Sequence, residues 1–188
     1  SARHIHTVGR PGEGPGEFRN PIALIRFGAD TVLVWDEGLR RVSVIAAGGA
    51  FARGIRVLGN FQNPLLISGL RDGTFLLSDS RPLVPASGRT ETVPLLVLRT
   101  KADGVGLDTL GRYPMGRVAS TDVMPGFAME AFSHGTSVTG GDGIFFVADG
   151  SKPEVVVRNP DGDTVRILGW EAPDRGVGPE DVQAFFHA

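Results

Sequence analysis

The residues in this sequence best suited to chemistry lie around one histidine. His134 follows two carboxylates along the chain, Asp122 and Glu130. A histidine near a carboxylate can bind a metal ion or act as a general base, so these three residues form the candidate catalytic set. The alternative is that His134 is a partly exposed polar residue in an irregular segment. His4 and His6 share one face of an expected strand, but no third metal ligand accompanies them.

Three aspartates each end a short apolar run, and their recurrence favours a structural role over a catalytic one. The runs occupy 31–36, 74–79 and 144–149 and end at Asp36, Asp79 and Asp149. Three carboxylates invite interpretation as one site, but an aspartate that ends a strand commonly accepts backbone N–H groups of the following turn. We therefore predict that these are structural repeat positions. Arg41 is expected to pair with Asp36 across the hairpin.

Several kinds of chemistry are excluded or disfavoured. The chain contains no cysteine, so disulfides, thiolate nucleophiles and cysteine-bound zinc are excluded. The glycine-rich run 9–17 lacks the Gly-Lys-Ser/Thr ending of a phosphate-binding loop. Glu13 and Glu17 would also repel a phosphate, and the run leads into a strand. We interpret it as a linker between structural units.

Composition indicates a folded, turn-rich chain. The 188 residues include 27 Gly and 13 Pro with 41% hydrophobic residues, which is typical of many short strands joined by tight turns. The net charge of −2 offers no basic footprint for nucleic acid. No apolar stretch approaches the roughly 18–20 residues that a membrane span needs. We therefore expect neither nucleic acid nor a membrane span among its partners.

The positions of the motifs reveal an internal repeat. Phe18, Asn20 and Pro21 return as Phe61, Asn63 and Pro64, 43 residues later, and Asp36 and Asp79 have the same separation. A period in this range, built from short apolar runs, is the signature of a repeat architecture such as a propeller. Asp-Gly pairs between the apolar runs mark tight hairpin turns. They occur at 72–73, 103–104, 142–143 and 161–162.

These signals predict three units of four antiparallel strands. Leu110-Gly111 should close the second unit, and the segments 80–92 and 114–126 should be irregular. Proline and acidic residues at 179–181 predict a short helix over 179–187. The expected strands are 22–27, 31–35, 41–46 and 51–58, then 65–70, 74–78, 94–100 and 106–110, then 132–139, 144–148, 154–158 and 164–168.

Residues 9–45 resemble an NHL repeat, and the chain as a whole is similar to six-bladed β-propellers of the NHL and TolB-like type. The matching positions are Gly9, Gly12, Gly14-Pro15-Gly16, Phe18, Pro21, Val34, Asp36 and Arg41-Val42. The second unit keeps Phe61, Pro64 and Asp79, and the third keeps little beyond Asp149. The resemblance implies a propeller fold and favours an extracytoplasmic or periplasmic location.

The expected fold is therefore all-β: a partial propeller of three four-stranded antiparallel blades, half of a six-bladed ring, with a short C-terminal helix. Residues 18–59, 60–111 and 127–169 would be the blades. Residues 3–9 would be the outer strand of a neighbouring blade. Three blades would leave two apolar faces open, and exposed apolar patches of that size favour self-association.

The function favoured by the sequence is a non-catalytic module that binds a protein or small ligand through its loops and central channel. The segments 80–92 and 114–131 would carry recognition, because loops on a rigid scaffold provide specificity. We predict no cofactor. The alternative is a metal-assisted enzyme of the lactonase or lyase type, with Ca²⁺ or Zn²⁺ and with His134, Glu130 and Asp122 as its residues. RNA binding, as in some NHL propellers, is a further and weaker alternative.

Overall fold

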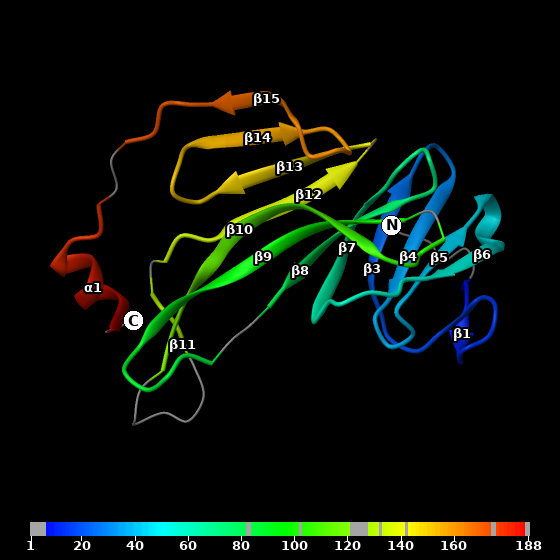
Figure 1. The fold of residues 1–188 in the computed structure, drawn as a ribbon, viewed down its shortest axis with the longest axis horizontal. Helices are drawn as coiled ribbons and strands as arrows, with labels where there is room; N and C mark the ends of the chain where they lie inside the picture. Colours follow the sequence, from blue (N-terminus) through cyan, green and yellow to red (C-terminus); the bar gives the residue numbers. More distant parts are fainter. Residues whose placement is uncertain are drawn as a thin grey trace, which may run out of the picture.

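The computed structural model describes residues 7–81, 84–101, 103–120, 128–131, 133–141, 143–173 and 176–186. This part of the chain forms three antiparallel sheets, a small parallel pair of strands, one α-helix and a short 3-10 helix over Ala47–Gly49. The expected all-β class is confirmed. Figure 1 shows the three sheets following one another in space in the order of the sequence.

Each sheet is a meander in which sequence neighbours pair. The first contains β3 (Pro21–Phe27), β4 (Thr31–Asp36), β5 (Arg41–Ile45) and β6 (Phe51–Arg56). The second contains β7 (Asn63–Gly69), β8 (Phe75–Ser80), β9 (Thr90–Thr100), β10 (Leu107–Ala119) and β11 (Ala128–Met129). The third contains β12 (Thr136–Gly141), β13 (Ile144–Asp149), β14 (Glu154–Arg158) and β15 (Thr164–Gly169). Outside the sheets, β1 (Arg10–Pro11) pairs in parallel with β2 (Glu17–Phe18), and α1 spans Pro179–Phe186.

Local chemistry explains the hairpins. Gly73 has φ +85° in the turn between β7 and β8, a conformation that residues with a side chain rarely adopt. Asp72 accepts the backbone N–H of Thr74 at 3.0 Å and stabilises the same turn. The Asp-Gly signal therefore locates this turn correctly.

The second sheet is longer than the sequence predicts. β10 continues through Gly111 to Ala119, so the prediction that Leu110-Gly111 closes the strand is wrong. Two register shifts relative to β9, at 109/111 and 114/116, accommodate the glycines inside the continuous strand. Much of the segment expected to be irregular at 114–126 is therefore strand. We call residues 90–93 and 116–119 together with β11 the arm.

Two other expected boundaries also differ from the structure. β12 begins at Thr136, so His134 precedes the strand on which it was expected. Residues 3–6 of the expected N-terminal strand lie outside the described residues, and residues 7–9 form no strand. The short C-terminal helix is confirmed as α1, which ends at Phe186.

Each sheet has two faces, which we name by the order of the chain. The front face turns toward the preceding sheet and the rear face toward the following one. The rear of the first sheet packs on the front of the second in one apolar cluster that includes Leu33, Trp35, Leu66 and Leu77. The rear of the second packs on the front of the third in another cluster that includes Leu76, Val97, Phe145 and Val147.

The first strands of the three sheets lie next to one another, β3 beside β7 and β7 beside β12. Two glycines permit this approach. A Cβ on Gly69 would stand 2.6 Å from Leu33 Cδ1, and one on Gly140 would stand 2.8 Å from Ile67 Cγ2. Both distances are too short for a real side chain, so these glycines set the spacing of the sheets.

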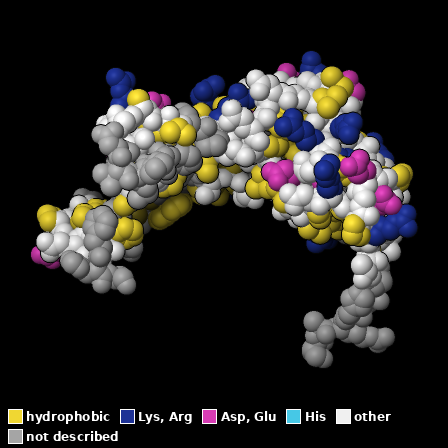
Figure 2. Space-filling model, turned by 90° about the horizontal axis from the view of Figure 1, so that it is seen from below, with side chains coloured by type: hydrophobic (Ala, Val, Ile, Leu, Met, Phe, Trp, Pro, Cys, Tyr) yellow, Lys and Arg dark blue, Asp and Glu magenta, His cyan; other side chains and the backbone are white. Residues whose placement is uncertain are grey.

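The chain as a whole is curved. Figure 2 shows it hollowed on one side, with hydrophobic side chains reaching the surface there. Among the residues that the structure describes, no helix is long and apolar enough to cross a bilayer.

Candidate functional site

The three repeat aspartates align the sheets with one another. Asp36 is paired with Pro21, Asp79 with Pro64 and Asp149 with Thr136, so these residues occupy equivalent places. Counting back from each aspartate, the residue immediately before it lies on the rear face. That residue is Trp35 in the first sheet, Ser78 in the second and Ala148 in the third.

Trp35 fills the junction between the first and second sheets. Its side chain is fully buried, and its indole Nε1–H donates a hydrogen bond to the carbonyl of Pro64 at 2.9 Å. A buried tryptophan contributes a large apolar area, and a partner for its N–H removes the penalty of burying that polar group. This junction is therefore packed where β4 ends.

Ser78 leaves the equivalent place between the second and third sheets open. A cavity of about 310 Å³ lies there, contributed to by five strands of the two sheets. This volume is at the lower end of the range for ligand pockets, about 300–1,000 Å³. The residues that line it are Asn63, Leu65, Ser78, Ser80, Leu95, Met115, Thr136 and Val138.

The chemistry of the cavity is apolar with neutral polar groups. Its polar lining consists of hydroxyl and amide side chains and contains no ionisable group. Thr136 is 8% exposed, and its Oγ1 has no hydrogen-bond partner in the described part of the chain. An unpaired buried hydroxyl is costly, and a ligand that hydrogen-bonds to it would recover that cost. The lining suits a small neutral molecule with an apolar body.

The structure joins the two segments that the sequence assigns to recognition. The backbone N–H of Gly88 donates to the Ser120 carbonyl at 2.8 Å, and that of Ser120 donates to Arg89 at 3.1 Å. Residues 84–92 and 114–120 therefore meet at the arm, which extends the second sheet. Met115 of β10 lines the cavity, so this segment also contributes directly to the site.

The carboxylates of Asp36 and Asp79 are both fully buried, and both accept hydrogen bonds from the backbone of the chain itself. Asp36 accepts the backbone N–H groups of Arg19, Asn20 and Leu39 at 2.7, 3.1 and 3.0 Å. Only the bond from Leu39 lies in the following turn, where the sequence predicts such bonds. The other two tie β4 to the segment that leads into β3. The predicted Asp36–Arg41 ion pair is not formed: the Arg41 guanidinium donates to the carbonyl oxygens of Glu13 and Glu17.

Asp79 repeats this arrangement with one addition. It accepts the backbone N–H groups of Gln62 and Asn63, both at 2.8 Å, and the Nε–H of Arg81 at 3.0 Å. The two residues immediately before the repeated proline are therefore bound by the aspartate in both the first and the second sheet. This explains physically why the Asn-Pro and aspartate motifs share a 43-residue period.

Asp149 differs from the other two aspartates. It is only partly buried, and it accepts the Ser151 N–H at 2.9 Å, which is the main cause that lowers its pKa. It lines a surface hollow of about 730 Å³ together with His134, Lys152, Glu154 and Trp170. Electrostatic interaction with Lys152 and His134 lowers the pKa of Asp149 further.

The candidate catalytic residues do not assemble in the described part of the chain. Glu130 forms an ion pair with Arg117 at 3.0 Å, whereas His134 is exposed at the hollow beside Asp149. Asp122 lies outside the described residues. Within the described ranges, no three His, Asp or Glu residues are grouped closely enough to hold a metal ion.

A polar clamp joins the second and third sheets at the opposite end from the aspartates. Arg99 pairs with Asp72 and with Asp161, each at 2.6 Å. The Thr74 hydroxyl, which donates to Asp72 at 2.7 Å, is the largest cause that lowers the pKa of Asp72, and Arg99 lowers it further. The clamp therefore holds the two sheets together without filling the cavity.

No protein-family model matches this chain, and no curated protein is detectably similar to it in sequence. The resemblance of residues 9–45 to an NHL repeat therefore stays a prediction.

Sequence reasoning did not identify the cavity, although a signal for it was present. When the runs 31–36 and 74–79 are aligned on their final aspartates, Ser78 occupies the sequence position that corresponds to Trp35. Loss of the largest side chain at a repeated buried position indicates a cavity in that repeat. That Thr136 completes the site could not be inferred in this way, because its pairing with Asp149 depends on the strand register.

Proposed function

We propose that this chain is a non-catalytic β-propeller module, three blades of a six-bladed ring, that binds a small neutral ligand between its second and third sheets. The observation that carries this proposal is the exchange of Trp35 for Ser78 at equivalent rear-face positions. A cavity takes the place of an indole, and neutral hydrogen-bonding groups line it.

The arrangement of the strands supports the propeller part of the proposal. Each unit is a meander of sequential antiparallel strands, and the first strands of successive units lie side by side. Radially placed four-stranded meanders are the construction of a propeller blade. The first strands of the second and third units, β7 and β12, both contribute to the cavity.

The ligand class follows from what fills the equivalent place in the other junction. There, an indole packs between the sheets and its N–H is bound by the carbonyl of Pro64. In the second junction Thr136 occupies the place of Pro64, and its hydroxyl is unpaired. A small flat molecule with one hydrogen-bond donor therefore suits this cavity, and indole itself is the first probe.

Titration of the protein with indole, followed by calorimetry and thermal unfolding, tests the proposal. The expected results are saturable binding and a melting temperature that rises with indole concentration. Ser78→Trp should abolish the binding, because its own indole would occupy the cavity. Thr109→Trp, at an exposed position of β10 outside the cavity, is the matched control and should bind as the wild type does.

Thr136→Val tests the polar contact separately. This substitution should weaken the binding of indole by about five- to tenfold, which corresponds to the loss of one hydrogen bond. The unliganded protein should be no less stable than the wild type, because the hydroxyl that is removed has no hydrogen-bond partner among the described residues. Absence of indole binding to the wild type, or binding by Ser78→Trp at wild-type affinity, would contradict the proposed site.

A further inference from the structure

The front face of the first sheet is the only front face that packs against no other sheet of the described chain. In the other two sheets, the positions four and two residues before the repeat aspartate are buried against the preceding sheet. Phe75 and Leu77 are 3% and 0% exposed there, and Phe145 and Val147 are 0% and 3% exposed. Val32 and Val34 occupy these positions in the first sheet, where Val32 is only partly buried and Val34 is 6% exposed.

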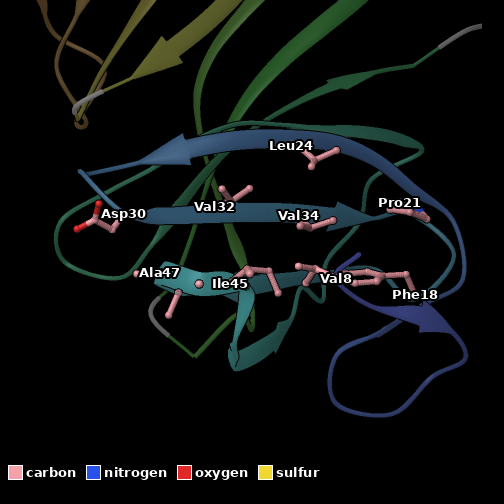
Figure 3. A pocket seen from close by; sticks show the side chains of 12 residues that line it. Val8, Phe18, Pro21, Leu24, Asp30, Val32, Val34, Ile45 and Ala47 are labelled. Atoms are coloured by element: carbon pink, nitrogen blue, oxygen red, sulfur yellow. The ribbon is translucent and has the colours of Figure 1, made fainter. Parts of the chain in front are cut away.

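A groove of about 420 Å³ lies over these valines. Figure 3 shows Val32, Val34 and Leu24 presented to it from β3 and β4, with Ile45 beside them and Val8 and Phe18 at one end. Leu24 is 72% exposed, although its counterpart by strand pairing, Leu66, is 3% exposed in the second sheet. The groove therefore has the shape and chemistry of half a junction between sheets.

The complementary half is present on the same chain. Phe146 lies on the rear face of the third sheet, three residues before the repeat aspartate. Leu33 and Leu76 occupy this position in the first and second sheets, and they are 1% and 0% exposed because a following sheet covers them. Phe146 is only partly buried. Leu168, which is paired with Val155 on the same face, is 45% exposed.

We infer that the front face of the first sheet binds the rear face of the third sheet of a second copy of this chain. This contact would repeat the sheet-on-sheet arrangement that occurs twice within the chain, with the same repeat positions in contact. Such a head-to-tail contact closes when the rotation between copies permits, and two copies would then form a symmetric dimer with two equal junctions. Closure would cover both apolar faces, which soluble monomers rarely expose.

The mass in solution provides the first test. We expect light scattering after gel filtration to give twice the 19.9 kDa of one chain. Leu24→Arg and Leu168→Arg should each weaken the dimer by about tenfold or more, because they place a charge in an apolar contact. The matched control is Ile167→Arg, because Ile167 is also exposed, at 57% against 45% for Leu168, but lies on the front face of β15. It should leave the dimer intact.

Cysteine crosslinking provides the second test and does not depend on affinity. The chain has no cysteine, so Leu24→Cys on β3 and Thr139→Cys on the rear face of β12, where Thr139 is paired with Phe146, introduce single thiols on first strands, which lie side by side in the junctions within the chain. Mixing the two variants under mild oxidation should give mainly the mixed crosslinked pair. The control mixture of Leu24→Cys with Ile167→Cys should give little.

A wild-type chain that remains a single copy across the concentration series would overturn the inference. A dimer that responds equally to Leu168→Arg and Ile167→Arg would also overturn it, as would equal crosslinking of Leu24→Cys with Thr139→Cys and with Ile167→Cys. An open series of larger species would contradict closure into a dimer. These outcomes are independent of whether indole binds the cavity, because the cavity lies within one chain.

Discussion

The two junctions between sheets in this chain have the same plan but differ at one position. Between the first and second sheets, Trp35 fills the space and donates its N–H to Pro64. Between the second and third, Ser78 stands at the same place and a cavity of about 310 Å³ remains. The comparison teaches that a repeat can preserve its scaffold through the buried aspartates while one position on the rear face decides whether a junction is solid or hollow.

The largest expected effect comes from emptying the solid junction. Trp35→Ser should lower the free energy of unfolding by about 3–5 kcal/mol, because it removes a fully buried aromatic and creates a cavity. Urea unfolding measures the loss. The control, Trp170→Ser, should cost far less because Trp170 is 55% exposed. Equal losses in the two variants would show that Trp35 does not hold the junction.

The second effect distinguishes the two kinds of repeat aspartate. Asp79→Ala should cost about 3 kcal/mol, because it leaves buried N–H groups and the Arg81 guanidinium without their acceptor. Asp149→Ala should cost about 1 kcal/mol or less, because its carboxylate is only partly buried. Paired denaturation curves provide the comparison, and a larger loss for Asp149→Ala would reverse our assignment.

The third effect concerns the spacing of the first strands. Gly69→Ala and Gly140→Ala should each cost about 1–3 kcal/mol, because the added methyl group would overlap a side chain of the neighbouring sheet. Gly140→Ala should be the milder of the two, since the hollow junction has room to adjust. Gly141→Ala is the control, because a Cβ there meets nothing within 4 Å. A control variant as unstable as Gly140→Ala would rule out overlap as the cause.

The smallest effect is expected at the clamp of the hollow junction. The lowered pKa of Asp72 means that its ionised form stabilises the fold above its unfolded pKa, and that this stability is lost as the pH falls through the folded pKa. Asp72→Asn should therefore cost less than about 1 kcal/mol at neutral pH, because the side chain is 48% exposed. The difference from the wild type should shrink as the pH falls below the ordinary aspartate pKa, and it should vanish once Asp72 is protonated in the folded state. A difference that persists there would exclude ionisation as its source.

Strand positions in the sheets were largely predictable because they depend on local signals. Alternation in Arg41–Ile45 and the Asp-Gly turn at 161–162 locate β5 and the end of β14 within a residue or so. The arm was not predictable. Pro114 opens a segment that we expected to be irregular, yet it lies opposite Pro94 in the long β9–β10 hairpin. Only the pairing of the two strands stabilises an extended conformation at this position.

The catalytic hypothesis illustrates the same limit. His134, Glu130 and Asp122 are neighbours in the sequence, but the ion pair of Glu130 with Arg117 depends on how β10 returns to β11. Proximity along the chain predicts a shared site only where the backbone between the residues is regular. In the described part of this segment the only regular element is β11, which contains neither Glu130 nor His134.

The amino-acid sequence by itself determined the repeat, the all-β class, the hairpin turns and the place of each aspartate, because these depend on side chains close together in the chain. Only the tertiary structure decided that Thr136 lies opposite Asp149, that one junction is filled and the other hollow, and that one apolar groove stands open. These features depend on which faces meet across sheets, and that is settled by long-range packing and by shifts in strand register.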